Sequence, residues 1–122
     1  MARPLDPQPE TNRQLGNALE VMPNTPLWQR APVRDEYGRL LSDFMMIVPG
    51  LNRRPKAEIS DVLRRIEHVL GLYGRSVVFA DLNLRLNTLW VSVRPVPGIC
   101  LELPAVIHHY VAEAVLVHHP AR

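Results

Sequence analysis

The chain has 122 residues, of which 47% are hydrophobic and 21% are charged, and its formal net charge is +2. These values are typical of one globular domain, because a chain of this length can bury a single hydrophobic core. The apolar content is enough to order most of the chain, so any disorder is expected to be local. The basic residues form no continuous tract, so nucleic acid is not the expected partner.

The apolar runs are too short to cross a membrane. The longest, "FMMIV" at 44–48, falls well below the roughly 20 residues that a spanning helix needs. The N-terminal "MARPLDPQPE" has no apolar stretch typical of a signal peptide. The single Cys100 excludes an intramolecular disulfide. We therefore expect a cytoplasmic protein with no membrane contact.

The N-terminal part is rich in proline, which fixes φ and lacks an N–H donor. Half of the twelve prolines precede residue 43: Pro4, Pro7, Pro9, Pro23, Pro26 and Pro32. We expect residues 1–26 to form a flexible arm, in which "NRQLGNALEVM" could be a short helical turn or a strand. Residues 27–42 contain a turn signal at Asp35–Gly38, and this predicts an additional strand and turn.

The remaining chain alternates between strand and helix patterns. The run 43–48 predicts a buried strand that ends at Pro49. An amphipathic helix follows, because apolar residues recur at helical spacing in Ile59, Val62, Leu63, Ile66, Val69, Leu70 and Tyr73. Residues 76–96 predict a β-hairpin with its turn at 87–88. A second helix, with Pro104 in its first turn, and a closing strand at 114–119 complete the pattern.

This order predicts an α+β fold of the ferredoxin-like βαββαβ kind over residues 43–119, with residues 120–122 as a tail. The sheet should be antiparallel, with both helices on one face. The region resembles ACT-type regulatory domains in element order and spacing, and "VPGLNRRP" at 48–55 resembles their Gly-containing turn. The resemblance implies a regulatory module that binds an effector at this turn.

Two groups of residues are candidates for binding. Gly50, Arg53, Arg54 and Lys56 lie where the first long helix begins, and free N–H groups at a helix start favour an anion. The alternative interpretation is a solvated basic loop. Trp90 and Arg94 are expected to form an interaction surface on the sheet, since Trp is enriched at interfaces. An exposed sheet face and edge strands favour a homodimer.

The paired histidines are candidate metal ligands. The candidates are His108, His109, His118 and His119. Metal-binding helices place ligands at i and i+4, and neither pair has this spacing. Adjacent histidines on a strand also point to opposite faces. We therefore expect no metal ion and no cofactor. Cys100 precedes the second helix and is expected to be a small core residue rather than a nucleophile.

The sequence thus predicts a non-enzymatic regulatory or protein-interaction module, a homodimer that binds a small anionic effector or a partner protein. One alternative is a small enzyme with a pocket at the dimer interface, for which the candidate acid–base groups are His68, Tyr110, Asp81 and Arg85. These residues occur at no recognised catalytic spacing. A second alternative is a weak binder of single-stranded RNA that uses Trp90 and Phe44.

Overall fold

The structure is a computed structural model that describes residues 19–21 and 26–118. In chain order its elements are β1 (Leu19–Val21), α1 (Leu27–Arg30), β2 (Ser42–Ile47), the short 3-10 helix η2 (Leu51–Arg53), α2 (Lys56–Leu72), β3 (Val77–Asn83), β4 (Thr88–Val93), α3 (Ile99–Tyr110) and β5 (Val115–His118). Strands and long helices both occur from β2 onwards, and this confirms the predicted α+β class.

The five strands form one sheet in the order β1-β3-β4-β2-β5. The neighbours among β2, β3, β4 and β5 are antiparallel, and β1 is parallel to β3. In the central pair, Phe44 lies opposite Val91 and Met45 lies opposite Trp90. Because successive side chains point to opposite faces, these two pairs serve different faces of the sheet.

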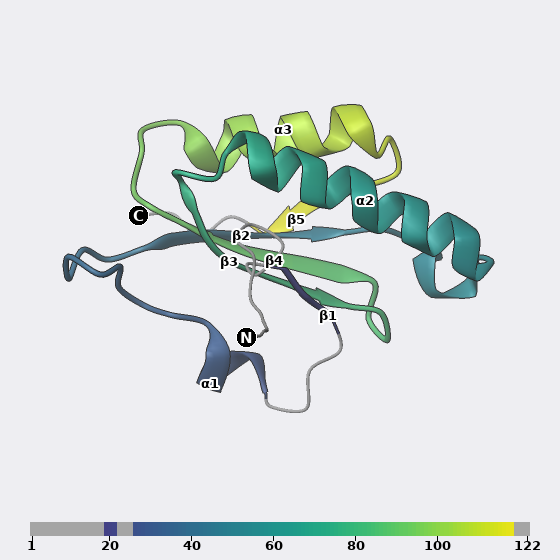
Figure 1. The fold of residues 1–122 in the computed structure, drawn as a ribbon, viewed down its shortest axis with the longest axis horizontal. Coiled ribbons are helices and arrows are strands. Elements are labelled where there is room, and N and C mark those ends of the chain that lie inside the picture. Colours follow the sequence, from purple (N-terminus) through teal and green to yellow (C-terminus); the bar gives the residue numbers. More distant parts are fainter. Residues whose placement is uncertain (1–18, 22–25, 119–122) are drawn as a thin grey trace, which may run out of the picture.

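The molecule has two main layers, as Figure 1 shows: α2 and α3 cover one face of the sheet, and α1 lies on the opposite side. Between the helices and the sheet is a core of fully buried side chains. Its largest members are Phe44, Met46, Leu51, Ile66, Leu70, Leu82, Leu89, Leu103 and Ile107. Burying such side chains supplies the main driving force for the α+β fold.

The second long helix begins earlier than the sequence predicts. Pro104 was expected in its first turn, but α3 begins at Ile99 and Pro104 lies inside it. Cys100 is therefore in the first turn rather than before the helix. Ile99 and Cys100 are buried with the rest of the apolar stripe, and this extra burial offsets the backbone hydrogen bond that an internal proline cannot donate.

The turn between β3 and β4 covers residues 84–87, so Thr88 already belongs to β4. Asn87 has a positive φ of 58°, a conformation that asparagine tolerates better than most residues. The side chain of Asn83 accepts hydrogen bonds from the N–H groups of Arg85 and Leu86. These contacts fix the end of the hairpin.

The N-terminal segments add a strand at one edge of the sheet and place α1 on the side away from α2 and α3. Of the alternatives left open for the proline-rich arm, the structure has a strand, β1, which pairs with residues 80–82 of β3. In the predicted strand-and-turn segment, α1 comes first, and Arg34 and Leu40 then form a single antiparallel bridge around the Asp35–Gly38 turn. Residues 1–18 and 120–122 of the predicted arm and tail lie outside the described residues.

Over the described ranges, α2 is the longest helix, and no helix is both long and apolar enough to span a bilayer.

Candidate ligand pocket on the helix-free sheet face

The face of the sheet away from α2 and α3 carries a mixed set of side chains. They belong to alternate positions of the three central strands: Asp43, Met45, Phe79, Asp81, Trp90 and Ser92. Asp43 lies opposite Ser92, and Asp81 lies opposite Trp90. Aromatic and acidic groups are therefore neighbours on this face.

Residues 26–41, which we call the cover segment, lie over part of this face. Its first part, α1, is attached by Arg30, whose guanidinium Nη2 lies 2.9 Å from Oδ1 of Asp81. The same guanidinium stands 5.7 Å from the ring centre of Phe79. Only 13% of the Arg30 side chain and 7% of the Asp81 side chain are exposed. This largely buried ion pair holds α1 against the sheet.

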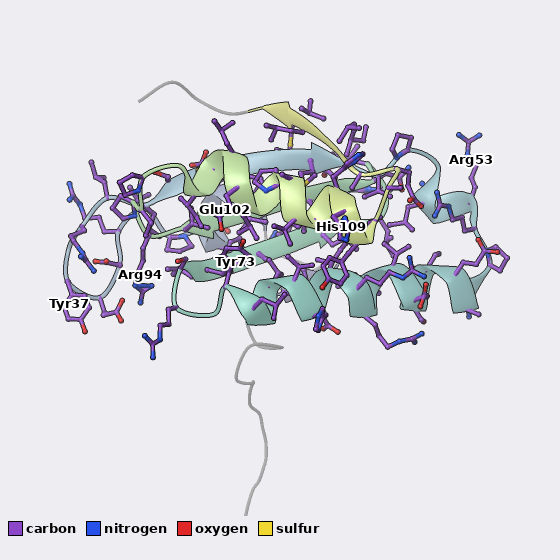
Figure 2. All side chains as sticks on the ribbon, turned by 90° about the horizontal axis from the view of Figure 1, so that it is seen from above. Tyr37, Arg53, Tyr73, Arg94, Glu102 and His109 are labelled. Carbon is purple, nitrogen blue, oxygen red and sulfur yellow. The ribbon has the colours of Figure 1, made fainter. Side chains whose placement is uncertain are left out.

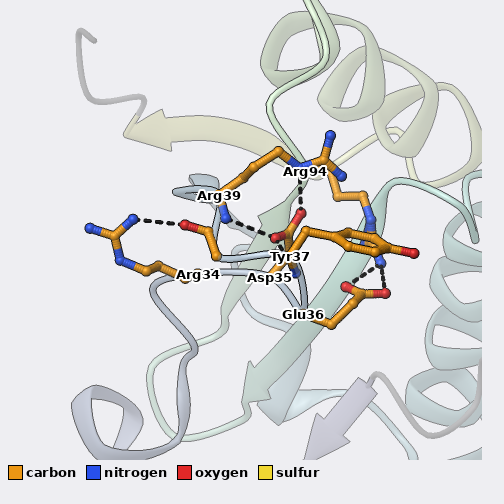
Figure 3. A network of polar contacts seen from close by, with 7 residues as sticks. Arg34, Asp35, Glu36, Tyr37, Arg39 and Arg94 are labelled. Carbon is orange, nitrogen blue, oxygen red and sulfur yellow. Dashed lines mark hydrogen bonds and ion pairs between the residues drawn. The ribbon is translucent and has the colours of Figure 1, made fainter.

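The other part of the cover segment is the turn that Figure 3 shows. The Asp35 carboxylate accepts hydrogen bonds from the backbone N–H groups of Tyr37 and Arg39, and from Nε of Arg39. Arg34 donates to the carbonyl oxygen of Gly38. Burial raises the pKa of Asp35, but these hydrogen bonds outweigh it, and the pKa lies below its ordinary value. The turn therefore carries a charged carboxylate at neutral pH.

A second ion pair fastens this turn to the sheet. Arg94, just after β4, donates from Nη2 to both carboxylate oxygens of Glu36, at 2.8 and 2.9 Å. Arg94 was predicted to be part of an interaction surface. Its guanidinium is engaged by Glu36 within the chain, and Trp90 lies earlier in β4, under the cover segment.

Between the cover segment and the sheet lies a pocket of about 590 Å³. It is lined by Leu27, Trp28, Ala31, Pro32, Val33, Leu40, Leu41, Asp43 and Trp90. Sites for small molecules commonly have volumes of about 300 to 1,000 Å³, apolar walls and few polar groups. The pocket has these properties.

Both tryptophans of the chain line the pocket. Trp90 is half-buried, and its indole Nε1 donates to the hydroxyl of Ser92 at 3.1 Å, which fixes the ring on the sheet. Trp28 lies on α1 with 78% of its surface exposed. The pocket therefore has one fixed indole at its base and one exposed indole at its rim.

The residues of the predicted anion site have different surroundings in the structure. Gly50 has a left-handed φ of 72° and precedes η2. Arg54 forms a close ion pair with Glu113, beyond the end of α3. Arg53 and Lys56 are exposed. Figure 2 shows Arg53 at one end of the molecule and Arg94 at the other, so the two predicted binding groups are separate regions.

The Arg54–Glu113 pair gives a prediction about acid stability. The hydrogen bond from Arg54 holds the pKa of Glu113 below its ordinary value of 4.5. A carboxyl group with a lowered folded-state pKa stabilises the fold above its unfolded pKa, and this contribution disappears as the pH falls through the folded value. The Glu113→Gln variant should therefore lose about 0.5 kcal/mol of stability near neutral pH, since the pair is partly exposed.

Below the lowered pKa, the Glu113→Gln variant and the original chain should unfold at the same urea concentration. Glu67→Gln, which changes an exposed carboxylate on α2, is the control and should leave the profile unchanged. A stability difference between the Glu113 variant and the original chain that is the same at neutral and acidic pH would show that the ion pair is not the cause.

The histidines have separate roles. Nδ1 of His108 lies 2.7 Å from the carbonyl oxygen of Ala114, so a protonated Nδ1 closes the turn after α3. The ring of His109 stands edge-on to Tyr110. Within residues 19–21 and 26–118, no three His, Cys, Asp or Glu side chains could together hold a metal ion. His119 and the side chain of His118 lie outside the described part.

The candidate acid–base residues are also dispersed. His68 and Tyr110 are in ring contact at 5.2 Å on the helix layer. Asp81 lies on the opposite face of the sheet in its ion pair with Arg30, and Arg85 is exposed in the β3–β4 turn. The sheet therefore separates these groups, and they form no catalytic arrangement. Cys100 is buried, with its Sγ 3.9 Å from the carbonyl oxygen of Asp43.

Trp90 is recognisable as a candidate from the sequence, but the pocket is not, because most of its other walls come from the cover segment. One signal was present: "PLWQRAP" at 26–32 places leucine and tryptophan between prolines. An apolar, proline-bounded segment of this kind gains stability only by packing on another element. Comparison with protein-family models, with curated proteins and with solved structures finds no match.

Proposed function

We propose that this chain is a non-enzymatic, ligand-binding regulatory module whose small effector occupies the pocket between the cover segment and the sheet. The observation that carries the proposal is the pocket itself, with its apolar walls and two indoles. Binding there would hold the cover segment against the sheet. A ligand could thereby change the surface that this segment presents to a partner protein.

The proposal includes a ferredoxin-like, ACT-like arrangement. Its support is the strand order β3-β4-β2-β5. In this order β4 lies between β2 and β3, which α2 connects, and β2 lies between β4 and β5, which α3 connects. An anionic effector at the Gly50–Lys56 turn, as the resemblance implies, stays a prediction. It has less support than the pocket, because Arg54 is engaged by Glu113.

We further propose that the module is a homodimer, with β5 as the contact. This strand is at one end of the sheet order, and its Val115, Leu116 and Val117 are 45%, 39% and 54% exposed. An apolar edge strand offers N–H and C=O groups to another strand. Pairing β5 with its own copy in an antiparallel sense satisfies two-fold symmetry. Residues 115–117 are all apolar, so this pairing buries no charged side chain of theirs at the interface.

The two alternatives have weaker support. An RNA-binding sheet needs aromatic rings that are open to bases, whereas Trp90 lies in the pocket under the cover segment and Phe44 is fully buried in the core. For an enzyme, the candidate acid–base groups lie on different faces of the sheet. Neither alternative uses the pocket as it is built.

The pocket can be tested through its own fluorescence. The screen uses small, largely apolar fragments, some cationic, some neutral and some anionic. We expect those that bind to raise the melting temperature of the protein and to change its tryptophan emission. Trp90→Ala should weaken the binding of such a fragment about 30-fold, because truncation of a central Trp commonly costs 2 kcal/mol or more. Trp28 remains as the reporter in that variant.

Leu86→Ala is the matched control, since Leu86 is an exposed side chain in the β3–β4 turn. This variant should bind the fragment as the original chain does. If no fragment in a broad collection changes both signals, or if Trp90→Ala binds as well as Leu86→Ala does, the pocket is not the effector site.

A further inference from the structure

The lining of the pocket brings aromatic and aliphatic side chains together. Trp90 is half-buried on the sheet and Trp28 lies at the rim, and these two residues are the only tryptophans of the chain. Most of the other lining residues are aliphatic or proline residues of the cover segment, such as Leu27 and Pro32. Contacts between aromatic rings are more favourable than the area they bury would suggest. An aromatic ligand therefore fits this lining better than a purely aliphatic one.

The polar atom of the Trp90 ring is already in use. Its Nε1 donates to the hydroxyl of Ser92, two positions further along the same face of β4. A ligand that reaches Trp90 therefore meets the carbon surface of the indole rather than a hydrogen-bond donor. The same hydrogen bond holds the ring in one orientation, so the side chain loses little conformational freedom when a ligand packs on it. A flat, apolar ring makes a large contact with such a surface.

The rim of the pocket leaves apolar surface in contact with water. Trp28, Val33 and Leu40 line the pocket, yet 78%, 67% and 52% of their surfaces are exposed. Removal of apolar surface from water favours binding roughly in proportion to the area covered. A planar ligand between the cover segment and the sheet would cover these side chains and Trp90 at the same time.

Ionic ligands find little support in the lining. No arginine or lysine is among the described residues that line the pocket, so a carboxylate or phosphate group would lose water without gaining a basic partner there. The acidic lining residue, Asp43, already has an interaction within the chain, and an ammonium group would have to compete with it. Burial of a charge is costly unless the charge is paired. The lining therefore favours a ligand with no net charge.

We propose that the pocket binds an uncharged, planar aromatic compound, with its ring against the indoles of Trp28 and Trp90. This inference rests on the proposed function and adds the chemical class of the ligand. It differs from the anionic effector that the turn at Gly50–Lys56 would bind. Because Trp28 belongs to α1, a ring held by both indoles connects the cover segment to the sheet.

The test compares four compounds of similar size: naphthylmethanol, its saturated decahydro analogue, naphthoate and naphthylmethylamine. Each is titrated into the full chain at neutral pH, and calorimetry measures its affinity. We expect naphthylmethanol to bind about fivefold more tightly than the saturated alcohol, because only the aromatic ring stacks on the indoles. The anion and the cation should each bind about tenfold more weakly than naphthylmethanol, since both lose hydration in the pocket.

A matched pair of variants tests the role of the exposed indole. Trp28→Leu should remove most of the preference for the aromatic alcohol and leave the affinity for the saturated alcohol nearly unchanged, because leucine keeps the rim apolar. Unchanged binding of the saturated alcohol also shows that this variant keeps its fold. Tyr37→Leu is the control, since Tyr37 is an exposed aromatic residue of the cover segment that does not line the pocket. This variant should retain the full preference.

The outcomes separate this inference from the proposed function. If the saturated alcohol, the anion or the cation binds as tightly as naphthylmethanol does, the pocket is a ligand site but the assigned ligand class is wrong. The same conclusion follows if Trp28→Leu keeps the preference for the aromatic alcohol. If none of the four compounds binds, this inference is wrong, and the proposed function fails with it when the broad fragment screen also finds no ligand.

Discussion

Replacement of Arg30 by methionine is expected to lower the free energy of unfolding by about 3 kcal/mol. Arg30 and Asp81 are both largely buried, and removal of the guanidinium takes a close opposite charge away from a largely buried carboxylate. Because the same ion pair attaches α1 to the sheet, ligands in the pocket should also bind roughly tenfold more weakly. Urea denaturation measures the first effect, and tryptophan fluorescence measures the second.

Arg75→Met is the matched control, because Arg75 is exposed in the turn before β3, and it should change neither quantity. Adding Asp81→Leu to Arg30→Met should restore much of the lost stability, since apolar residues often replace a buried ion pair at little cost. Equal stability of the Arg30→Met and Arg75→Met variants would mean that α1 is held by apolar packing alone.

Replacement of Leu116 by lysine is expected to convert the proposed dimer fully into a monomer. In an antiparallel pair of β5 strands, the two new ammonium groups would lie close together across the two-fold axis. Like charges on facing strands are destabilising. Light scattering on the purified chain gives the molar mass before and after the change.

Leu72→Lys is the control for Leu116→Lys. Leu72 is an exposed leucine at the end of α2, away from the sheet edge, so this variant should keep the mass of a dimer. A monomeric original chain would refute the β5 contact. So would a Leu116→Lys variant that keeps the mass of a dimer.

The regular elements were predictable because their burial follows a simple period. In α2, the residues with helical spacing, such as Ile66 and Leu70, are the fully buried ones. The start of α3 was not predictable in the same way, because a proline is typical of the first turn of a helix but Pro104 lies inside α3. Gly98, with a φ of 78°, is the N-cap that precedes the helix, and the buried Ile99 extends the apolar stripe upstream.

The candidate site is held by contacts between residues that are far apart in the sequence. Local sequence patterns do not predict such contacts. Trp90 was recognisable as an aromatic residue on a polar strand face. The cover segment was not, because α1 has only four residues and no side-chain cap. Its position depends on Arg30 meeting Asp81, 51 residues further along the chain. Local propensity contains no information about such a pair.

The position of β1 limits how far the chain can assemble. A sheet with an unpaired edge strand on both borders could pair with another copy on each side and grow into a fibre. In the described part of the chain, β1 has three residues and occupies the border opposite β5, so it offers another copy few backbone N–H and C=O groups. In the proposed dimer, pairing through β5 would cover the longer free border of each copy, so assembly would stop at two copies.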